Sequence, residues 1–188
     1  MRPFMNKKEK GSTLIEWAMI MPVLLVLALG AYEYGMVFRD SHTVSTAVRE
    51  AGRVAASAAD HGKADCVILE AASGALQALQ TGEIDEVHIY KSDVNGSYPG
   101  PSSSFTRRYR PAVPMEPGLI QCTSGAEWYP IQLGSNWDPN DRVDDPGDAD
   151  WIGVRIEYTH TFQTNFLWFS GTTQLDDEAV FRIEPPAP

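Results

Sequence analysis

A run of uncharged apolar residues near the N-terminus limits what this chain can fold into more than any other feature. Residues 17–31 read WAMIMPVLLVLALGA, and the run extends outward to about 20 residues, long enough to cross the hydrocarbon core of a bilayer. Pro22 would kink a helix in water, but a membrane helix tolerates it. Aromatic residues near both ends, Trp17, Tyr32 and Tyr34, are typical of the two membrane interfaces. The sequence therefore predicts one membrane-spanning helix.

The charges on the two sides of this helix differ in sign. The first eleven residues carry a net charge of +3, whereas the whole chain of 188 residues carries −10. A basic flank stays on the cytoplasmic side of a membrane, so the acidic remainder is expected to be exported. An acidic domain also disfavours nucleic acid as a partner, because phosphates attract clustered lysine and arginine.

Two ordinary interpretations of the N-terminal segment compete. Ala28-Leu29-Gly30 has the small-x-small pattern of a secretory signal peptide, which would release a soluble protein beginning at Ala31. The helical pattern, however, continues past Ala31 without a break. An uncleaved anchor explains the hydropathy equally well. An uncleaved anchor does not explain Glu16, however. Inserting a carboxylate at the membrane boundary costs on the order of 2.5–3.5 kcal/mol on insertion scales.

A third interpretation also uses the leader. The leader MRPFMNKKEKG ends at Gly11, and cleavage after it would make Ser12 the new amino terminus. Glu16 would then lie four residues beyond the free α-ammonium group, one helical turn away on the same face. The carboxylate would be satisfied within one subunit or between two. Hydropathy alone leaves all three interpretations open.

Three stretches of the chain resemble the type IV pilin class and, within it, the TadE-like minor pilins, or pseudopilins, of the Flp (tight adherence) pilus system. They read GSTLIEWAMIMPVLL, GAYEYGMVF and TAVREAGRVAA, and all lie within residues 11–56. Trp17 stands where the family has a Phe-like aromatic, and Gly52 interrupts the alanine-rich run. The rest of the chain resembles the family only in layout.

This resemblance implies a function, partners and a location. It implies cleavage between Gly11 and Ser12 by prepilin peptidase, and a role for Glu16 in membrane partitioning or subunit docking. The function would be assembly of a Flp/Tad-type pilus or a related secretion apparatus, with a bearing on cell adhesion. The partners would be the peptidase, other pilin subunits, the assembly machinery and the membrane. The protein would reside in the bacterial inner (cytoplasmic) membrane with its C-terminal domain exported, and it could be assembled into a surface pilus.

A different class of function stays open beside this one. The chain could be an uncleaved, single-pass membrane-anchored binding domain that uses an acidic loop to hold a ligand or a cation. The oxygen-bearing side chains of that loop would suit calcium, and they are Asp138, Asn140, Asp141, Asp144, Asp145, Asp148 and Asp150. Arg142 occupies what would be an EF-hand ligand position, and the terminal Glu is missing. A solvated loop is therefore the alternative to a calcium site at residues 138–150.

Catalytic motifs are absent from the sequence, and its four histidines share no common spacing. We therefore expect no enzyme activity and no cofactor, with calcium in the acidic loop as the alternative. Trp128, Tyr129 and Trp137, which lie near these acids in the sequence, could form an adhesive or partner-binding surface. They could equally cover a small core.

The sequence predicts an α+β fold in three parts: a leader at residues 1–11, a transmembrane helix at 12–38 and an exported pilin-like domain at 39–188. We expect one long helix from Thr13 to Ala59. Small apolar residues recur at three- and four-residue steps in its outer half, at Val44, Ala47, Val48, Ala51, Val54, Ala55 and Ala58. That stripe would pack on the exported domain or on a partner helix.

Glu33 is a second carboxylate on the expected helix. It lies 17 positions after Glu16, roughly 26 Å further along at 1.5 Å per residue. This distance is close to the hydrocarbon thickness, so Glu33 should reach the outer interface. There it would be a solvated head-group residue or a membrane and subunit-docking contact.

Within the exported domain, the sequence predicts a second helix and an antiparallel sheet packed on the long helix. The second helix is expected at Ala64–Leu79, followed by Gly82 as a terminator. Strands are expected at Ile84–Tyr90, Ile152–Thr159 and Glu178–Glu184 from alternation of apolar and polar residues. Residues 92–150 lack any sustained period and are rich in Ser, Pro and Gly at their start. We interpret them as one long surface loop.

Two cysteines, Cys66 and Cys122, lie in the second helix and in the predicted loop. They form no CxxC pattern and have no clustered histidines, which excludes a zinc-type ligand set. A disulfide between them would tie the loop to the helix and contribute roughly 4 kcal/mol in the chain-entropy model. Two buried free thiols are the alternative.

Overall fold

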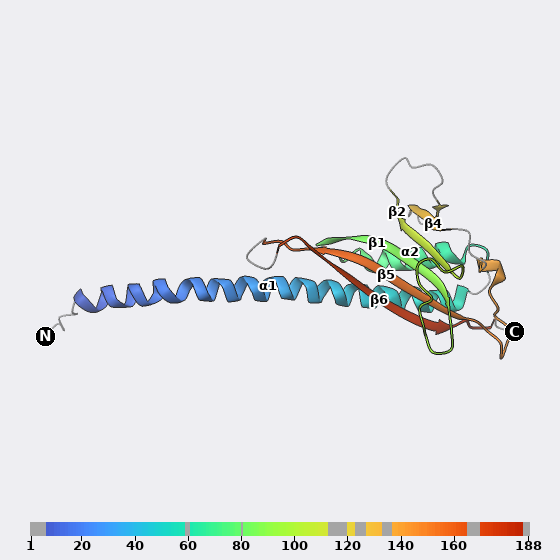
Figure 1. The fold of residues 1–188 in the computed structure, drawn as a ribbon, viewed down its shortest axis with the longest axis horizontal. Coiled ribbons are helices and arrows are strands. Elements are labelled where there is room, and N and C mark those ends of the chain that lie inside the picture. The colour runs from blue at the N-terminus through green and yellow to red at the C-terminus, as the bar shows by residue number, and fades with distance from the viewer. Residues whose placement is uncertain are drawn as a thin grey trace.

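The computed structural model describes residues 7–58, 61–79, 81–112, 120–122, 127–132, 137–164 and 170–185. It has the predicted α+β architecture, with a long helix α1 (Lys7–Ala58), a shorter helix α2 (Ala64–Leu76) and a six-stranded antiparallel sheet. Figure 1 shows that α1 protrudes far beyond the domain, whereas the sheet lies along its C-terminal half. The fold class expected from the sequence is confirmed.

The six strands of the sheet follow the order β3-β4-β2-β1-β5-β6, and each neighbouring pair is antiparallel. Their bounds are β1 (Gly82–Ser92), β2 (Thr106–Pro111), β3 (Ile120–Gln121), β4 (Glu127–Gln132), β5 (Trp151–Thr161) and β6 (Thr172–Arg182), and a short 3-10 helix η1 (Pro139–Asp141) precedes β5. Strands β5 and β6 pair without a register shift along their whole length. They form a long hairpin that runs beside α1 (Figure 1).

The prediction of a single long loop at residues 92–150 is wrong, because this range contains β2, β3, β4 and η1. Strand β2 shows why the alternation was hidden. Arg107 and Tyr109 face the interior opposite Ile89 and Val87, so a charged residue occupies an apolar position. Arg107 is tolerated there because Asp65 of α2 neutralises it at 2.7 Å. A buried ion pair thus removed the period-two signal.

The stripe of small residues on α1 packs on the domain of the same chain. Val44, Ala47, Val48, Ala51 and Ala55 are all buried, in contact with α2 and the β5–β6 hairpin. Small side chains let these elements approach α1 closely, which is the core-packing interpretation of the stripe.

Gly52, which interrupts the alanine-rich run, has a packing role. A Cβ atom added at Gly52 would lie only 2.5 Å from Cε2 of Phe181 on β6. The missing side chain therefore makes room for an aromatic ring between the helix and the edge strand.

The predicted element types hold, but several bounds differ. Helix α2 ends at Leu76 rather than Leu79, because the Leu79 N–H bonds to the Leu76 carbonyl and closes a turn. Strand β6 begins at Thr172 rather than Glu178. Its first half was missed because Asp177 holds a position on the α1-facing side of the strand, between Leu175 and Ala179, and breaks the apolar alternation.

Candidate functional site: the N-terminal helix and its junction with the domain

The N-terminal part of α1 is an apolar rod that the domain does not cover. From Thr13 to Tyr32 nearly every residue is exposed, including Leu14 at 71% and Leu27 at 63%. Within the described residues, one helix is long and apolar enough to cross a membrane, with a mean hydropathy of 2.2 over its most apolar window. Soluble monomers rarely expose so large a continuous apolar surface, so this segment needs lipid or apolar helices around it.

The predicted cleavage site and Glu16 both lie on this rod. Gly11 and Ser12 are inside α1, and the helix continues through Pro22 and past Ala31 without interruption. Glu16 is exposed on the apolar part of the helix, four residues beyond Ser12. Cleavage after Gly11 and a docking role for Glu16 stay predictions.

Glu33 marks the point where the domain first contacts α1. Its side chain is completely buried, and its two carboxylate oxygens accept hydrogen bonds from the backbone N–H groups of Gln163 and Thr164. Those residues lie two and three positions after the end of β5, so Glu33 ties the end of the hairpin to the helix. The sequence placed Glu33 at the outer interface but missed this contact within the chain. Its role at the membrane or in subunit docking stays a prediction.

Asp40 lies two turns further along the same face of α1 and is also completely buried. Its Oδ2 atom accepts hydrogen bonds from the hydroxyls of Thr81 and Tyr158, the latter at 2.6 Å, and lies 2.9 Å from Nδ1 of His160. Burial raises the pKa of Asp40, but these hydrogen bonds outweigh it, and the pKa lies below its ordinary value. Burial and the neighbouring Asp40 carboxylate raise the pKa of Tyr158.

Sequence reasoning missed the cluster of Asp40, Thr81, Tyr158 and His160, although two signals were available. Asp40 is in phase with the buried stripe that begins at Val44, so an acid sits on an apolar helix face. His160 continues the inward-facing alternation of β5. Neither signal says which acid meets which histidine, because the two residues are 120 positions apart.

Glu33 and Asp40 together fix how much of α1 is left for the membrane. The domain is held to α1 from Glu33 outward, and the uncovered stretch Thr13–Tyr32 is about 30 Å long at 1.5 Å per residue. This length equals the usual hydrocarbon thickness. The junction therefore lies where a membrane-spanning helix would leave the bilayer.

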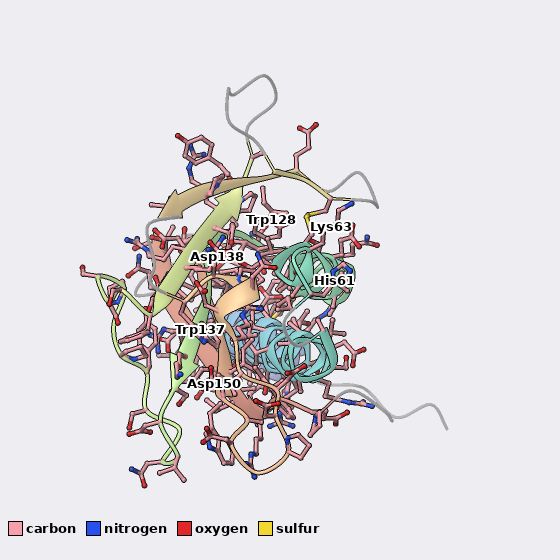
Figure 2. The ribbon with its side chains drawn as sticks, turned by 90° about the vertical axis from the view of Figure 1, so that its right-hand side faces the viewer. His61, Lys63, Trp128, Trp137, Asp138 and Asp150 are labelled. Atoms are coloured by element: carbon pink, nitrogen blue, oxygen red, sulfur yellow. A yellow bond between two sulfur atoms is a disulfide. The ribbon has the colours of Figure 1, made fainter. Side chains whose placement is uncertain are left out.

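The distal end of the domain, which Figure 2 views, is held by an ion-pair cluster centred on Asp65. Arg107 and Arg142, both buried, pair with the two oxygens of Asp65, and the hydroxyl of Tyr109 donates to the same carboxylate. The disulfide between Cys66 and Cys122 lies next to this cluster and joins α2 to the end of β3. Helix α2 is thus fixed to the sheet by charge and by a covalent bond.

The same cluster organises the acidic loop at 138–150. Arg142, at the position where an EF-hand would have a ligand, lies over the ring of Trp137, 4.7 Å from its centre. The indole of Trp137 donates to Asp150 at 3.0 Å, and Lys91 pairs with Asp150 at 2.6 Å. Asp138 pairs with the guanidinium of Arg107 at 3.1 Å. Two of the acids thus have cationic partners, and a calcium ion in this loop stays a prediction.

The aromatic residues proposed for an adhesive surface are mostly interior. Trp128 and Trp137 are buried in the core, and only Tyr129 is half-exposed, beneath the guanidinium of Arg110. These tryptophans pack the domain rather than face a partner.

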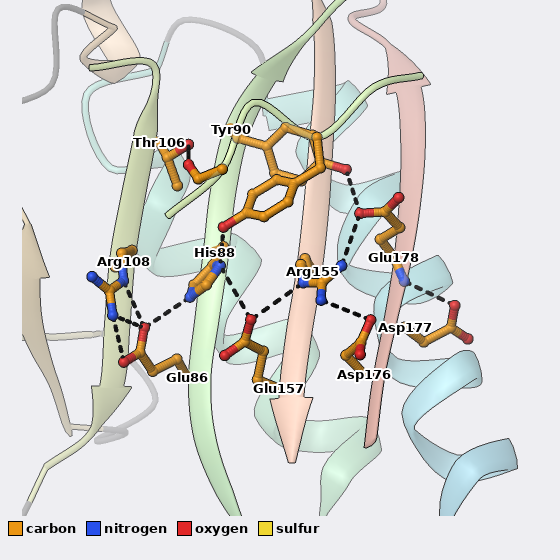
Figure 3. Close-up of polar contacts among 12 residues, drawn as sticks. Glu86, His88, Tyr90, Thr106, Arg108, Arg155, Glu157, Asp176, Asp177 and Glu178 are labelled. Atoms are coloured by element: carbon orange, nitrogen blue, oxygen red, sulfur yellow. Dashed lines mark hydrogen bonds and ion pairs between the residues drawn. The ribbon is translucent and has the colours of Figure 1, made fainter. Parts of the chain in front are cut away.

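The outer face of the sheet carries a ladder of alternating charges, shown in Figure 3. Arg108 donates two 2.7 Å hydrogen bonds to Glu86, and Oε2 of Glu86 lies 2.8 Å from Nε2 of His88. Glu157 and Arg155 extend the ladder to the acids of β6. Burial raises the pKa of Glu86, but its contacts with Arg108 and His88 outweigh burial and lower the pKa overall.

Three members of this ladder, Glu86, His88 and Glu157, have ligand atoms within 4.8 Å of one another, the spacing that a metal ion needs. Arg108 already occupies both oxygens of Glu86, and the hydroxyl of Tyr98 lies 2.6 Å from the second ring nitrogen of His88. A metal ion would have to displace a guanidinium and a phenol. The arrangement fits a structural ladder better than a metal site.

The comparison with protein families bears on the helix and its junction. Residues 11–53 resemble TadE-like proteins. The model of the family described as TadE-like protein matches this segment, from Gly11 through the uncovered rod to Arg53 on the packed half of α1. No curated protein and no solved structure matches the chain. The match confirms the resemblance drawn from the sequence.

The TadE-like segment contains the predicted cleavage site and the carboxylates of α1 that were singled out above. Gly11, Ser12, Glu16, Glu33 and Asp40 all lie within it, whereas both cysteines and the acidic loop lie outside. The TadE-like segment points to a role related to the Tad pilus and to contact with membrane or pilus components. The domain after Ala58 contacts this segment through Glu33 and Asp40, and these contacts hold the two parts together.

Proposed function

We propose that the chain is a minor pilin or pseudopilin that supports assembly of a Flp/Tad-type pilus or a related secretion apparatus. Prepilin peptidase would cleave the precursor between Gly11 and Ser12 in the inner membrane, and the mature protein would act by packing, without enzymatic chemistry. The observation that carries the proposal is the uncovered rod of α1, which is TadE-like and stands clear of a domain clamped at Glu33 and Asp40.

The continuity of α1 supports retention of the rod. The helix runs from Lys7 to Ala58 in one piece, so the region of the small-x-small pattern before Ala31 lies within a regular helix. A cut there would remove the whole uncovered surface and leave only the half of α1 that packs on the domain. A leader cut after Gly11 keeps the rod intact.

Packing of the rod explains how Glu16 would work. A carboxylate at the centre of a membrane helix costs on the order of 2.5–3.5 kcal/mol on insertion scales, which favours any state in which its charge is matched by a cation. The free α-ammonium group of Ser12, in the same or a neighbouring subunit, would supply that match. The rod would then leave the bilayer and pack on other helices in a single step, because that packing matches the charge of Glu16.

A complementation assay tests the proposal in a strain that lacks the gene for this chain. Glu16→Ala should abolish or strongly reduce pilus assembly, although the protein is still made and inserted. Glu83→Ala is a matched control, because Glu83 is an exposed acid that belongs to β1 and not to the rod. If Glu16→Ala and wild type restored pili equally, the role given to Glu16 would be wrong. If the strain that lacks the gene assembled as many pili as the strain that carries it, the proposed function itself would be wrong.

A further inference from the structure

The face of α1 opposite the domain carries a row of basic residues. Arg39, His42, Thr46, Arg49 and Arg53 follow one another at steps of three and four, so they lie along one side of the helix, and all five are exposed. The buried face of α1 lies on the other side of the helix axis. We call these five residues the basic ridge.

Glu50, an acid beside the ridge, offsets its positive charge only weakly. Glu50 lies 3.9 Å from Arg53, but the two side chains are 54% and 75% exposed, and ion pairs of this kind contribute little. Arg49 has no side-chain partner in the part of the chain that the structure describes. The ridge therefore presents a net positive charge to its surroundings.

The rest of the molecule has the opposite charge. Beyond Ala58 the chain contains eight basic and twenty acidic residues. The acidic loop contributes Asp144, Asp145 and Asp148, which are partly or fully exposed and have no side-chain partner among the described residues. They differ in this from Asp138 and Asp150 of the same loop, which pair with Arg107 and Lys91.

We propose that the basic ridge of one copy of this chain docks the acidic loop of a second copy. The proposal rests on the proposed function, in which the chain is an assembling subunit, and it names the partner. The two surfaces carry complementary charges, and Arg49, Asp145 and Asp148 have no side-chain partner among the described residues. Charge complementarity of this kind selects partners and fixes register more than it adds affinity.

The positions of the two surfaces define the geometry of the contact. Figure 1 shows η1 and the segment that follows it at the end of the molecule farthest from the N-terminus, whereas the ridge lies alongside the domain. Thr46, at the centre of the ridge, precedes the end of α1 by twelve residues, about 18 Å. Neighbouring copies would be offset along the long axis by at least this distance. A head-to-tail contact between two different surfaces, combined with this axial offset, generates an open stack rather than a closed dimer or ring.

Anionic lipid is the other occupant that a basic ridge suggests, but the height of the ridge argues against it. Arg49 and Arg53 lie 17 and 21 residues beyond Tyr32, about 26 and 31 Å above the end of the uncovered rod. The screening length at physiological ionic strength is only about 8 Å. Arg39 alone is close enough to contact head groups, so lipid would leave most of the ridge without a partner.

Photo-crosslinking of the full chain in detergent micelles tests this docking, because no bilayer then holds both copies at the same height. A benzophenone side chain at Thr46 places the probe in the ridge without removing a charge. In micelles of a non-ionic detergent we expect a crosslinked dimer whose linked peptide contains Asp145. Arg49→Glu with Arg53→Glu should reduce the dimer about tenfold, because each exposed charge pair contributes roughly 1.5- to 5-fold. Asp145→Arg with Asp148→Arg should do the same, and the four changes together should restore the dimer.

Control variants separate charge from packing. Arg49→Lys with Arg53→Lys keeps the ridge basic and should leave the dimer nearly unchanged, and Glu83→Arg alters an exposed acid outside the loop and should have no effect. The proposal is overturned if the charge reversals leave the dimer unchanged. It is also overturned if the linked peptide comes from elsewhere, or if crosslinks form only to lipid in vesicles that contain phosphatidylglycerol.

The same samples distinguish failure of this proposal from failure of the proposed function. The mass of the chain purified from cells gives its first residue. A chain that begins at Ser12 but forms no charge-dependent dimer refutes the docking proposal alone. A chain that begins at Ala31 lacks the rod and refutes the proposed function, whatever the dimer yield.

Discussion

Replacement of Asp40 tests whether a buried carboxylate holds the domain against α1. The side chain is completely buried, with Oδ2 in contact with Thr81, Tyr158 and His160. Asp40→Ala would leave the buried polar groups of these residues without their shared acceptor. Removing one member of a buried charged network typically costs about 3–5 kcal/mol. Asp40→Asn keeps the shape and one acceptor oxygen, and should cost roughly 1.5–3 kcal/mol, the usual contribution of a hydrogen bond to a charged group.

Urea unfolding of the full chain in detergent micelles measures these costs. Near-ultraviolet circular dichroism reports on the domain, because Trp128 and Trp137 are buried in its core. Ser41→Ala is the matched control: Ser41 is the next residue on α1 and is exposed, so the change should alter the free energy of unfolding by less than about 0.5 kcal/mol. The reasoning is refuted if Asp40→Ala falls within the same range as Ser41→Ala.

Four more perturbations probe the other contacts of α1 and the distal end. Because the folded-state pKa of Asp40 lies below the ordinary 3.8, its stabilisation is present above that pH and is lost as the pH falls through the folded-state pKa. A pH series of urea unfolding should therefore show a steeper acid loss in wild type than in Asp40→Asn, and equal slopes would contradict this role. Glu33→Gln should speed hydrogen exchange at the amides of Gln163 and Thr164 by about tenfold, since their charged acceptor is lost. Unchanged exchange would mean that Glu33 does not hold the end of the hairpin. Cys66→Ser with Cys122→Ser should lower the free energy of unfolding by roughly 4 kcal/mol in the same urea assay, and a loss below 1 kcal/mol would contradict the chain-entropy account. Gly52→Leu should cost about 1–3 kcal/mol by displacing Phe181, whereas Gly35→Leu, where the structure leaves open space, should cost less, and the reverse order would be inconsistent with the packing.

The parts of the fold that the sequence predicts are those with one uninterrupted pattern. Helix α1 and strand β5 follow from apolar periodicity; β5 differs from its expected bounds by one or two residues, whereas α1 begins at Lys7, six residues before the expected Thr13. Strand β2 was missed because Arg107 faces inward, and only a partner distant in sequence, Asp65, makes that position tolerable. A local pattern cannot reveal a charge that is neutralised from another element.

The residues of the candidate site were predictable from the sequence only where local spacing links them. Gly11, Ser12 and Glu16 are linked by spacing along one helix, so the sequence could single them out together. Asp40 and His160 meet only because the β5–β6 hairpin folds back along α1, and no spacing predicts that contact. The contribution of Glu33 to the hairpin end was missed for the same reason, since its partners are backbone groups about 130 positions away.

The first residue of the mature chain tests the central claim most directly. The chain should be purified from cells with and without prepilin peptidase, and its intact mass measured. Our account predicts a product that begins at Ser12 when the peptidase is present and a precursor that begins at Met1 when it is absent. A product that begins at Ala31 in both strains, or at Met1 in both, would contradict it.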